Sequence, residues 1–191
     1  MWGRENMSNN RCRATYEGDP ILEEYHDNEW CKVNHNDQYQ FEMLCLEGAS
    51  VGLSWRTIMH KRPAYRAAFH DFDIAQCAIM TDEELEAQLQ NAGLIRNRNK
   101  IYSVRKNAKA VLAIQSEFGS FDAYLWSFTD GKRIDGQWKN TDEIPTVSDI
   151  SRRMSADMKK RGMSFVGEII TYSFVQSIGI VNDHLCDCEY R

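Results

Sequence analysis

Prolines are rare in this chain, and the long stretches between them carry helical spacing. Only three occur among 191 residues, at positions 20, 63 and 145. Between them apolar residues recur at helical intervals with few β-branched alternations, a pattern that favours helices over strands. We therefore expect a nearly all-α fold. The expected helices run at about 39–60, 63–70, 82–91, 98–117, 120–128, 148–161 and 165–179.

Local signals mark several of the expected boundaries. Thr81 and Glu84 have the spacing of a capping box at a helix start. Gly119 and Gly162 stand where helices are expected to end. The segment 130–145 (DGKRIDGQWKNTDEIP) is rich in turn residues, so we expect it to be an exposed connection.

Bulk properties limit the class of protein. With 42% hydrophobic residues the chain can bury a substantial core, and its length suits one domain. No window approaches about twenty apolar residues and residues 1–10 are polar, so we expect a cytoplasmic protein with no membrane-spanning segment. In that compartment the six cysteines are expected to be thiols or metal ligands rather than disulfides.

Charge is segregated along the chain. The formal net charge of −5 argues against indiscriminate coating of nucleic acid, because phosphate neutralisation supplies most non-specific binding. However, 95–110 contains only basic charges, whereas 82–86 is rich in acids. The sequence therefore predicts a local DNA-binding face. Its expected cations are Arg96, Arg98, Lys100, Arg105, Lys106 and Lys109.

Four residues near the two ends of the chain have side chains that zinc favours. Zinc prefers tetrahedral sites of thiolate and imidazole groups, and Cys12, His26, His184 and Cys188 supply two of each. His184 and Cys188 are one helical turn apart, but the other two lack the spacing of a compact zinc finger. Cys186 is a rival ligand on the same grounds. The alternative is that these cysteines are small buried hydrophobic residues.

A single acid interrupts the apolar run LCLEGASVGLSW at 44–55. Glutamate is rarely buried unless it is paired, so Glu47 is a candidate functional residue. The alternative is a surface acid on an amphipathic helix. On one helix, Glu47 and Trp55 would project roughly 80° apart, so both would border the same pocket. Gly48 and Gly52 would permit close backbone approach or a break.

The motif YHDNEW at 25–30 gathers two aromatic residues, one histidine and two acids. Such a group offers stacking surfaces and polar groups together. The alternative is structural, with Trp30 in the core, Asp27 capping a helix and His26 bonded to a neighbour.

The segment NAGLIRNRNKI at 91–101 reads as a helix end at Gly93, a short turn and a basic helix start. Amides at such a helix start can bind a phosphate, as in a helix-hairpin-helix. The usual second glycine is missing after Gly93, so a plain solvated turn is the alternative.

Together these stretches resemble the 3-methyladenine DNA glycosylase I family, a bacterial, constitutive type within the helix-hairpin-helix superfamily. The similar stretches run in order along most of the chain: YHDNEW, FEMLCLEGASVGLSW, GLIRNRNKI, EIPT, KKRGMSFVG and YSFVQSIGIVNDH. The resemblance implies an all-α, bilobed glycosylase domain at 11–191 whose termini are joined by a structural zinc site. Residues 1–10 have no counterpart, and we expect them to be a flexible tail.

The resemblance also assigns residues. It implies one zinc ion per chain, catalysis at Glu47 and a base pocket beside it. The implied zinc ligands are Cys12, His26, His184 and Cys188, and the implied base-binding residues are Tyr25, Trp55 and Trp30. The implied DNA-binding residues are Arg96, Arg98 and Lys100, joined by Lys159, Lys160 and Arg161.

The implied activity is excision of 3-methyladenine from alkylated double-stranded DNA by a monomer, with the free base as product of base excision repair. Such chemistry requires the nucleotide to be flipped out of the duplex. A purine methylated at N3 is cationic, so a carboxylate attracts it and aromatic faces add cation–π binding. Because that charge already activates the leaving group, we expect Glu47 to recognise the base and stabilise charge on the sugar; water activation is the alternative.

Some features depart from the family or leave rivals open. Ala14 stands where tryptophan is usual, Cys31 where glycine is usual, and Leu22 where some members have tyrosine. One rival is a glycosylase with lyase activity, which needs an amine nucleophile and, in many relatives, a four-cysteine iron–sulfur cluster; no compact four-cysteine run occurs. The other rival is a zinc-stabilised module that binds DNA or a protein without catalysis.

Overall fold

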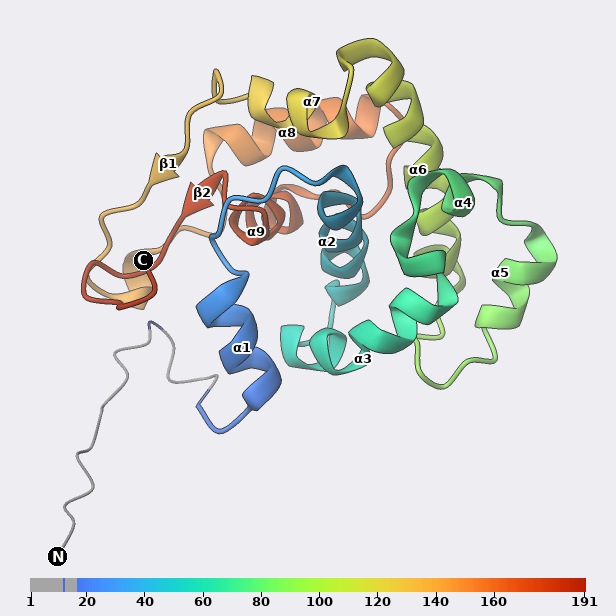
Figure 1. Cartoon of the computed structure of the whole chain (residues 1–191), viewed down its shortest axis with the longest axis horizontal. Helices are drawn as coiled ribbons and strands as arrows, with labels where there is room; N and C mark the ends of the chain where they lie inside the picture. The colour runs from blue at the N-terminus through green and yellow to red at the C-terminus, as the bar shows by residue number, and fades with distance from the viewer. Residues whose placement is uncertain (1–11, 13–16) are drawn as a thin grey trace, which may run out of the picture.

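The computed structural model describes residue 12 and residues 17–191, and it is mostly helical, as expected (Figure 1). The expected tail at 1–10 lies outside these residues, as does Ala14. The helices are α1 (Pro20–Asn28), α2 (Asp37–Ser50), α3 (Trp55–Ala68), α4 (Ile74–Ile79), α5 (Asp82–Gln88), α6 (Arg98–Phe118), α7 (Phe121–Ser127), α8 (Asp149–Lys160) and α9 (Glu168–Ser177), with short 3-10 turns at His70–Phe72 and Thr141–Glu143. The strands are β1 (Ile134–Asp135) and β2 (Val181–Asn182).

Helix α2 is the centre of the fold. Every residue from Gln40 to Ala49 is buried, so the helix has no solvent face. A helix surrounded in this way must pack on several neighbours, and α2 contacts α3, α6, α7 and α9. Figure 1 shows α4, α5 and α6 on one side of α2, with α9 and the two strands on the other.

The expected continuous helix at about 39–60 is wrong, because it is two helices. Helix α2 ends at Ser50, and Gly52 follows with φ of +76°, a conformation that favours glycine. Helix α3 then starts at Trp55, where the Ser54 side chain accepts a hydrogen bond from the Thr57 amide. The expected helix start at Pro63 is also wrong, since α3 continues through Pro63 to Ala68.

Two helices, α1 and α4, lie outside the expected set. Helix α1 begins at Pro20 after Asp19, whose side chain accepts hydrogen bonds from the first amides. Helix α4 has six residues, too few for an apolar stripe to repeat.

Other expected boundaries are confirmed. Thr81 and Glu84 form both hydrogen bonds of a capping box. Gly119 and Gly162 follow helix ends with φ of +90° and +87°, where a side chain would be strained.

The turn-rich segment at 130–145 is largely exposed, as expected, and it lies against the C-terminal strand. In the parallel pair β1–β2, Ile134 is opposite Val181 and Asp135 is opposite Asn182. Position 136 requires glycine, because an added Cβ would meet the Trp138 indole nitrogen and would lie 2.6 Å from an Asp183 oxygen. Across the described part of the chain, no helix has the length and apolar character to cross a membrane.

Buried ion pairs fix α1, α2 and α3 relative to one another. The Arg62 guanidinium of α3 contacts Glu42 of α2 at 2.8 Å and Glu29, just after α1, at 2.7 Å. Burial acts to raise the pKa of Glu42, but hydrogen bonds from Arg62 and Arg66 outweigh it and lower that pKa. Glu42 is therefore held as a carboxylate that joins two of the helices around the site described next.

Candidate active site and metal site

A cavity of about 900 Å³ opens between the C-terminal end of α2, the loop after it and the start of α9. The sequence-predicted residues Tyr25, Trp30, Glu47 and Trp55 all line it, although they come from α1, the turn after it, α2 and α3. Its size matches a small-molecule site. The structure therefore brings the four together.

Glu47 is the acid of this cavity. It lies on the buried helix α2 and is only 5% exposed, so it is not a surface acid on an amphipathic helix. The glycine after it permits close packing, because a Cβ on Gly48 would lie 3.1 Å from the Cβ of Phe165. The break at Gly52 then turns the chain so that Trp55 lines the same cavity.

Aromatic rings form much of the rest of the wall. The rings of Tyr25 and Trp55 lie 5.5 Å apart between centroids with their planes tilted by 56°. Tyr25 and Trp30 are buried, at 2% and 4% exposed. A buried carboxylate beside aromatic faces suits a planar ligand with positive charge.

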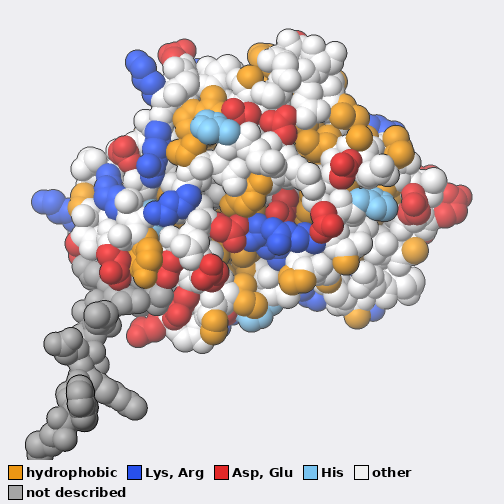
Figure 2. Space-filling view, viewed as in Figure 1, with side chains coloured by type: hydrophobic (Ala, Val, Ile, Leu, Met, Phe, Trp, Pro, Cys, Tyr) orange, Lys and Arg blue, Asp and Glu red, His pale blue; other side chains and the backbone are white. Residues whose placement is uncertain are grey.

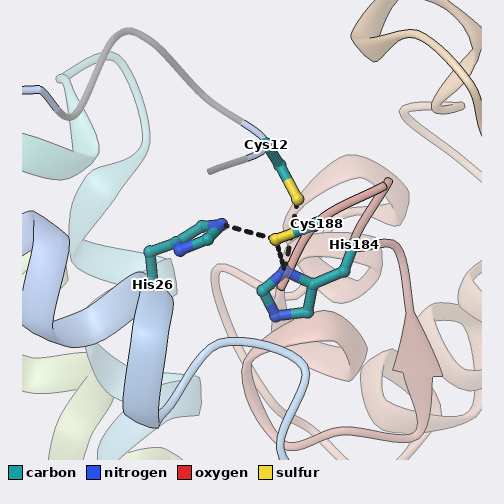
Figure 3. Close-up of side chains that lie close together, drawn as sticks. All are labelled: Cys12, His26, His184 and Cys188. Carbon is teal, nitrogen blue, oxygen red and sulfur yellow. Dashed lines mark hydrogen bonds between the residues drawn. The ribbon is translucent and has the colours of Figure 1, made fainter. Parts of the chain in front are cut away.

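The four predicted metal ligands also converge (Figure 3). Their ligand atoms lie within 4.8 Å of one another. The sulfur atoms of Cys12 and Cys188 lie 3.2 and 3.4 Å from His184 Nδ1, and Cys188 Sγ lies 3.9 Å from His26 Nε2. Tetrahedral zinc with ordinary bond lengths separates sulfur and nitrogen ligands by about 3.6 Å. The donor set and its spacing therefore fit such an ion.

The surroundings of the two histidines favour metal binding. His26 Nδ1 lies 2.8 Å from Asp27 Oδ1, and His184 Nε2 lies 3.0 Å from the Trp30 carbonyl oxygen. The ring nitrogens that face the two cysteine sulfurs are therefore His26 Nε2 and His184 Nδ1. Metal-binding histidines commonly bond their second nitrogen to a carboxylate or a carbonyl oxygen in this way. Burial is the main cause that lowers the pKa of His184 to about 4, so its ring is neutral at neutral pH, the form that binds metal.

Cys186, the rival ligand, does not belong to this group. It is exposed, and its sulfur lies 4.0 Å from Gln137 Oε1. Among the described residues, the group with metal-binding geometry consists of Cys12, His26, His184 and Cys188.

The unusual Cys31 has a structural consequence. Its φ is +61°, in the left-handed region that favours glycine. The Cys31 sulfur accepts a hydrogen bond from the Asp183 amide at 3.3 Å, a contact that glycine cannot make. Leu22, the other described departure, is buried in the core at 1% exposed and is not part of the cavity wall.

The basic run and the acidic run, separate in sequence, lie side by side in space. Arg98 pairs with Glu86, and Arg105 pairs with Asp82 at 2.6 Å. Acidic and basic side chains are also interspersed on the face in Figure 2. Two of the six cations expected to bind DNA, Arg98 and Arg105, are therefore paired with acids of the same chain.

Lys100 has a different place from the one expected. Its ammonium donates hydrogen bonds to the carbonyl oxygens of Ala49 at 2.9 Å and Val51 at 2.6 Å. These carbonyls end α2, and Val51 lines the cavity. Partial burial lowers the pKa of Lys100. Arg96, in contrast, is exposed and has none of these contacts.

Gly93 does not mark a helix end. Helix α5 ends earlier, at Gln88, and turns follow before α6 begins at Arg98. Glycine is needed because a Cβ at position 93 would lie 2.7 Å from the Cβ of Ala64 in α3. Residues 91–97 form turns packed on α3, the expected basic helix start is present as α6, and residues 91–101 are not part of the cavity wall.

Helix α9 contributes cavity residues that sequence reasoning missed. Ser173 and Gln176 line the cavity one turn apart. In the sequence, the spacing of these two residues in YSFVQS is that of an ordinary buried helix face. In the structure, Gln176 is 6% exposed, which is unusual for a glutamine and distinguishes this position.

Comparisons with known proteins agree with this site. A family model described as methyladenine glycosylase matches residues 15–191. The DNA-3-methyladenine glycosylase of Haemophilus influenzae is 45% identical over 171 residues, covering 90% of this chain and 92% of that protein. The corresponding figures for DNA-3-methyladenine glycosylase 1 of Escherichia coli are 44%, 170 residues, 89% and 91%.

A solved structure is similar over the same extent. The structure of 3-methyladenine DNA glycosylase I from Staphylococcus aureus, described as the basis of 3-methyladenine recognition, matches with a TM-score of 0.91 at 33% identity. It covers 95% of this chain and 96% of its own. On this similarity in sequence and in fold, the chain belongs to the methyladenine glycosylase family.

Proposed function

We propose that this protein is a monofunctional DNA glycosylase that excises 3-methyladenine from alkylated double-stranded DNA and leaves an abasic site. The carrying observation is the buried Glu47 in a cavity walled by Tyr25, Trp30 and Trp55. A base inside a duplex is out of reach of such a cavity, so the nucleotide must be flipped out. We expect the protein to act as a monomer.

The charge of the substrate explains the residues used. Methylation at N3 makes the purine cationic, so a nearby carboxylate attracts it and does not attract neutral adenine in the same way. Aromatic faces add cation–π attraction of about 0.5–2 kcal/mol. Glu47 together with the rings of Tyr25 and Trp55 therefore selects the damaged base over the normal one.

The reaction needs little acid catalysis. The bond between C1′ and N9 breaks with its electron pair moving to the purine, which cancels the positive charge and releases neutral 3-methyladenine. Water adds to C1′ and loses its proton, so the products are the free base and an abasic sugar. As C1′ becomes positively charged in the transition state, the Glu47 carboxylate stabilises it.

The DNA face lies around the mouth of the cavity. Lys159 lines the cavity, and Lys160 next to it is exposed. The first turn of α9 has no side-chain cap at Gly167, so its amides can bind a phosphate. This hairpin between α8 and α9 borders the cavity and serves as the helix-hairpin-helix. Arg161 is paired with Glu117 and Asp157, so it stabilises the hairpin instead.

Apolar side chains surround the same opening. Val51, Leu53 and Ile169 all line the cavity, yet they are 39%, 42% and 58% exposed. Exposed apolar groups at such a place can pack against bases and fill the gap that a flipped nucleotide leaves. Their position supports duplex DNA, rather than a free nucleoside, as the substrate.

Arg96 and Lys100 have different roles in this proposal, and substituting each with methionine separates them. We expect Arg96→Met to weaken DNA binding and to lower the slope of log affinity against log salt by about one, because one phosphate contact is lost. We expect Lys100→Met to keep that slope and to lower the excision rate about tenfold, because two hydrogen bonds that hold the cavity loop are lost.

DNA binding measured across a salt series, together with single-turnover excision, checks both variants. A reduced salt slope for Lys100→Met would return this residue to the phosphate contacts. An unchanged slope for Arg96→Met would remove Arg96 from the DNA face.

The metal group has a structural role in the proposal. We expect one zinc ion held by Cys12, His26, His184 and Cys188, whose donor atoms have the spacing of a tetrahedral site. Bound there, zinc would cross-link the segment at Cys12 to α1 and to the C-terminal residues. The ligands are buried and lie outside the cavity wall, so the ion has no part in bond cleavage.

Release of free bases from alkylated duplex DNA tests the function. We expect the purified protein to release 3-methyladenine and to leave abasic sites that break only after heat or alkali. Strand cleavage without that treatment would favour the lyase rival, for which Lys159 is the amine at the cavity. No release by the folded, zinc-loaded protein would favour the binding module.

A further inference from the structure

A buried carboxylate outside the cavity wall collects three hydrogen bonds. Asp183 is 0% exposed. It accepts from the Tyr172 hydroxyl at 2.6 Å, from Gln176 Nε2 at 2.7 Å and from Trp138 Nε1 at 2.7 Å. Each of the three donors is therefore held in place by an oxygen atom of the Asp183 side chain.

The contact with Asp183 decides which end of the Gln176 amide is left for the cavity. A carboxylate only accepts hydrogen bonds, so the amide must direct its NH₂ group toward Asp183. The reversed amide would place its oxygen against the carboxylate oxygen at 2.7 Å, which is repulsive. The carbonyl oxygen Oε1 is therefore the polar atom of the Gln176 side chain that is not bonded to Asp183.

This oxygen belongs to a side chain in the wall of the base cavity. Gln176 lines that cavity, lies at the border with a second cavity beside residues 139–146, and is 6% exposed. Its main chain is also fixed, since its carbonyl oxygen accepts from the Cys31 amide at 2.9 Å. Within the part of the chain that the structure describes, no donor bonds to Oε1. An acceptor of fixed orientation is thus available to a ligand.

We propose that Gln176 is a specificity-determining residue that accepts a hydrogen bond from the exocyclic amine at position 6 of the flipped purine, with Asp183 as its positioning residue. This proposal rests on the proposed function and names the base preference. Adenine has an amine at position 6 and guanine has a carbonyl oxygen there. The Gln176 oxygen therefore favours 3-methyladenine and repels 3-methylguanine, although both are cationic.

The size of the preference follows from leaving two acceptors unpaired. An unsatisfied buried polar group costs about 1–3 kcal/mol, which corresponds to roughly a 5- to 150-fold difference in excision rate. A site built to bind a substrate N–H group rejects an analogue that lacks it for the same reason. The attraction of Glu47 for positive charge does not distinguish the two bases.

Two substitutions test the proposal in different ways. Gln176→Met keeps the side-chain length and removes the acceptor, so we expect the ratio of 3-methyladenine to 3-methylguanine excision to fall about tenfold or more. Asp183→Asn supplies a donor, which permits the Gln176 amide to rotate and place its NH₂ group at the cavity. We expect that variant to shift the ratio further toward 3-methylguanine, a change that a loss of packing does not produce.

Tyr172→Phe is the matched control. It removes another donor to the same Asp183 carboxylate but leaves Gln176 bonded to it, so we expect the ratio to stay as in the wild type. Single-turnover excision of both bases from methylated duplex DNA gives the ratio, and melting temperature with zinc content shows that each variant is folded. If Asp183→Asn does not fold, Gln176→Met still tests whether Gln176 sets the base preference.

The outcomes separate the two proposals. No release of either base by the wild type would overturn the proposed function itself. Release of 3-methyladenine with an unchanged base ratio in Gln176→Met would overturn the role of Gln176 and leave the function intact. A ratio altered equally by Tyr172→Phe would show that packing, rather than amide orientation, sets the preference.

Discussion

Replacing Glu47 with glutamine is expected to lower the rate of 3-methyladenine release by about 100- to 1,000-fold, the loss typical when one electrostatic contact to a transition state is removed. Glutamine keeps the shape of the side chain but not its charge. The carboxylate is 5% exposed in a cavity with aromatic walls, where water screens it weakly. It therefore stabilises both the cationic base and the positive charge that develops on the sugar. Single-turnover release of free base from alkylated duplex DNA measures the effect.

The matched control is Glu83→Gln, the same change at an exposed position of α5 that is not part of the cavity wall. We expect it to leave the rate unchanged. Excision by Glu47→Gln at the wild-type rate would rule out the electrostatic role of Glu47. A loss confined to DNA affinity, with normal single-turnover release at saturation, would assign Glu47 to binding alone.

Cys188→Ala is expected to abolish stoichiometric zinc binding and to lower the melting temperature by about 10 °C. Cross-linking two distant segments stabilises a fold by about 3–5 kcal/mol, chiefly by restricting the unfolded chain, and 1 kcal/mol shifts the melting temperature by about 2–4 °C at this size. Cys12 and Cys188 lie near opposite ends of the sequence, so an ion bound to both would close a very long loop of chain. Removing one ligand also leaves buried polar groups in the site without the ion.

Cys186→Ala is the control for that experiment, because Cys186 is exposed and lies outside the metal-binding group. We expect it to keep both zinc content and melting temperature. Metal analysis and thermal unfolding of the two variants give the answer directly. Retained zinc in Cys188→Ala together with lost zinc in Cys186→Ala would exchange the two assignments.

Sequence patterns predicted the helical class and the groups that carry chemistry. An acid within an apolar run made Glu47 a candidate, because burying a carboxylate is costly unless it has a use, and the family resemblance assigned its role. The thiol and imidazole groups made a zinc site one reading of the sequence, and the family resemblance selected Cys12, His26, His184 and Cys188. Spacing left Cys186 as a rival until the structure placed it outside the group.

Helix boundaries were predicted less well, for an identifiable reason. The apolar run continues through 51–54, so the sequence predicts one helix across α2 and α3, although Gly52 also permits the break that the structure has at a φ of +76°. That break is what brings Trp55 to the cavity. Short elements such as α4 carry too few residues for periodicity to report them.

The sequence by itself determined the helical class and several of the helices, and it supplied residue types that suit a metal or a cationic base, because both depend on local spacing and on the chemistry of single side chains. Only the tertiary structure decided how those side chains are used. Lys100 is held by the carbonyls at the end of α2, and Gln176 is oriented by Asp183. A hydrogen bond between two elements depends on how those elements pack. Apolar periodicity predicts that a helix face is buried, but it does not predict which residues that face contacts.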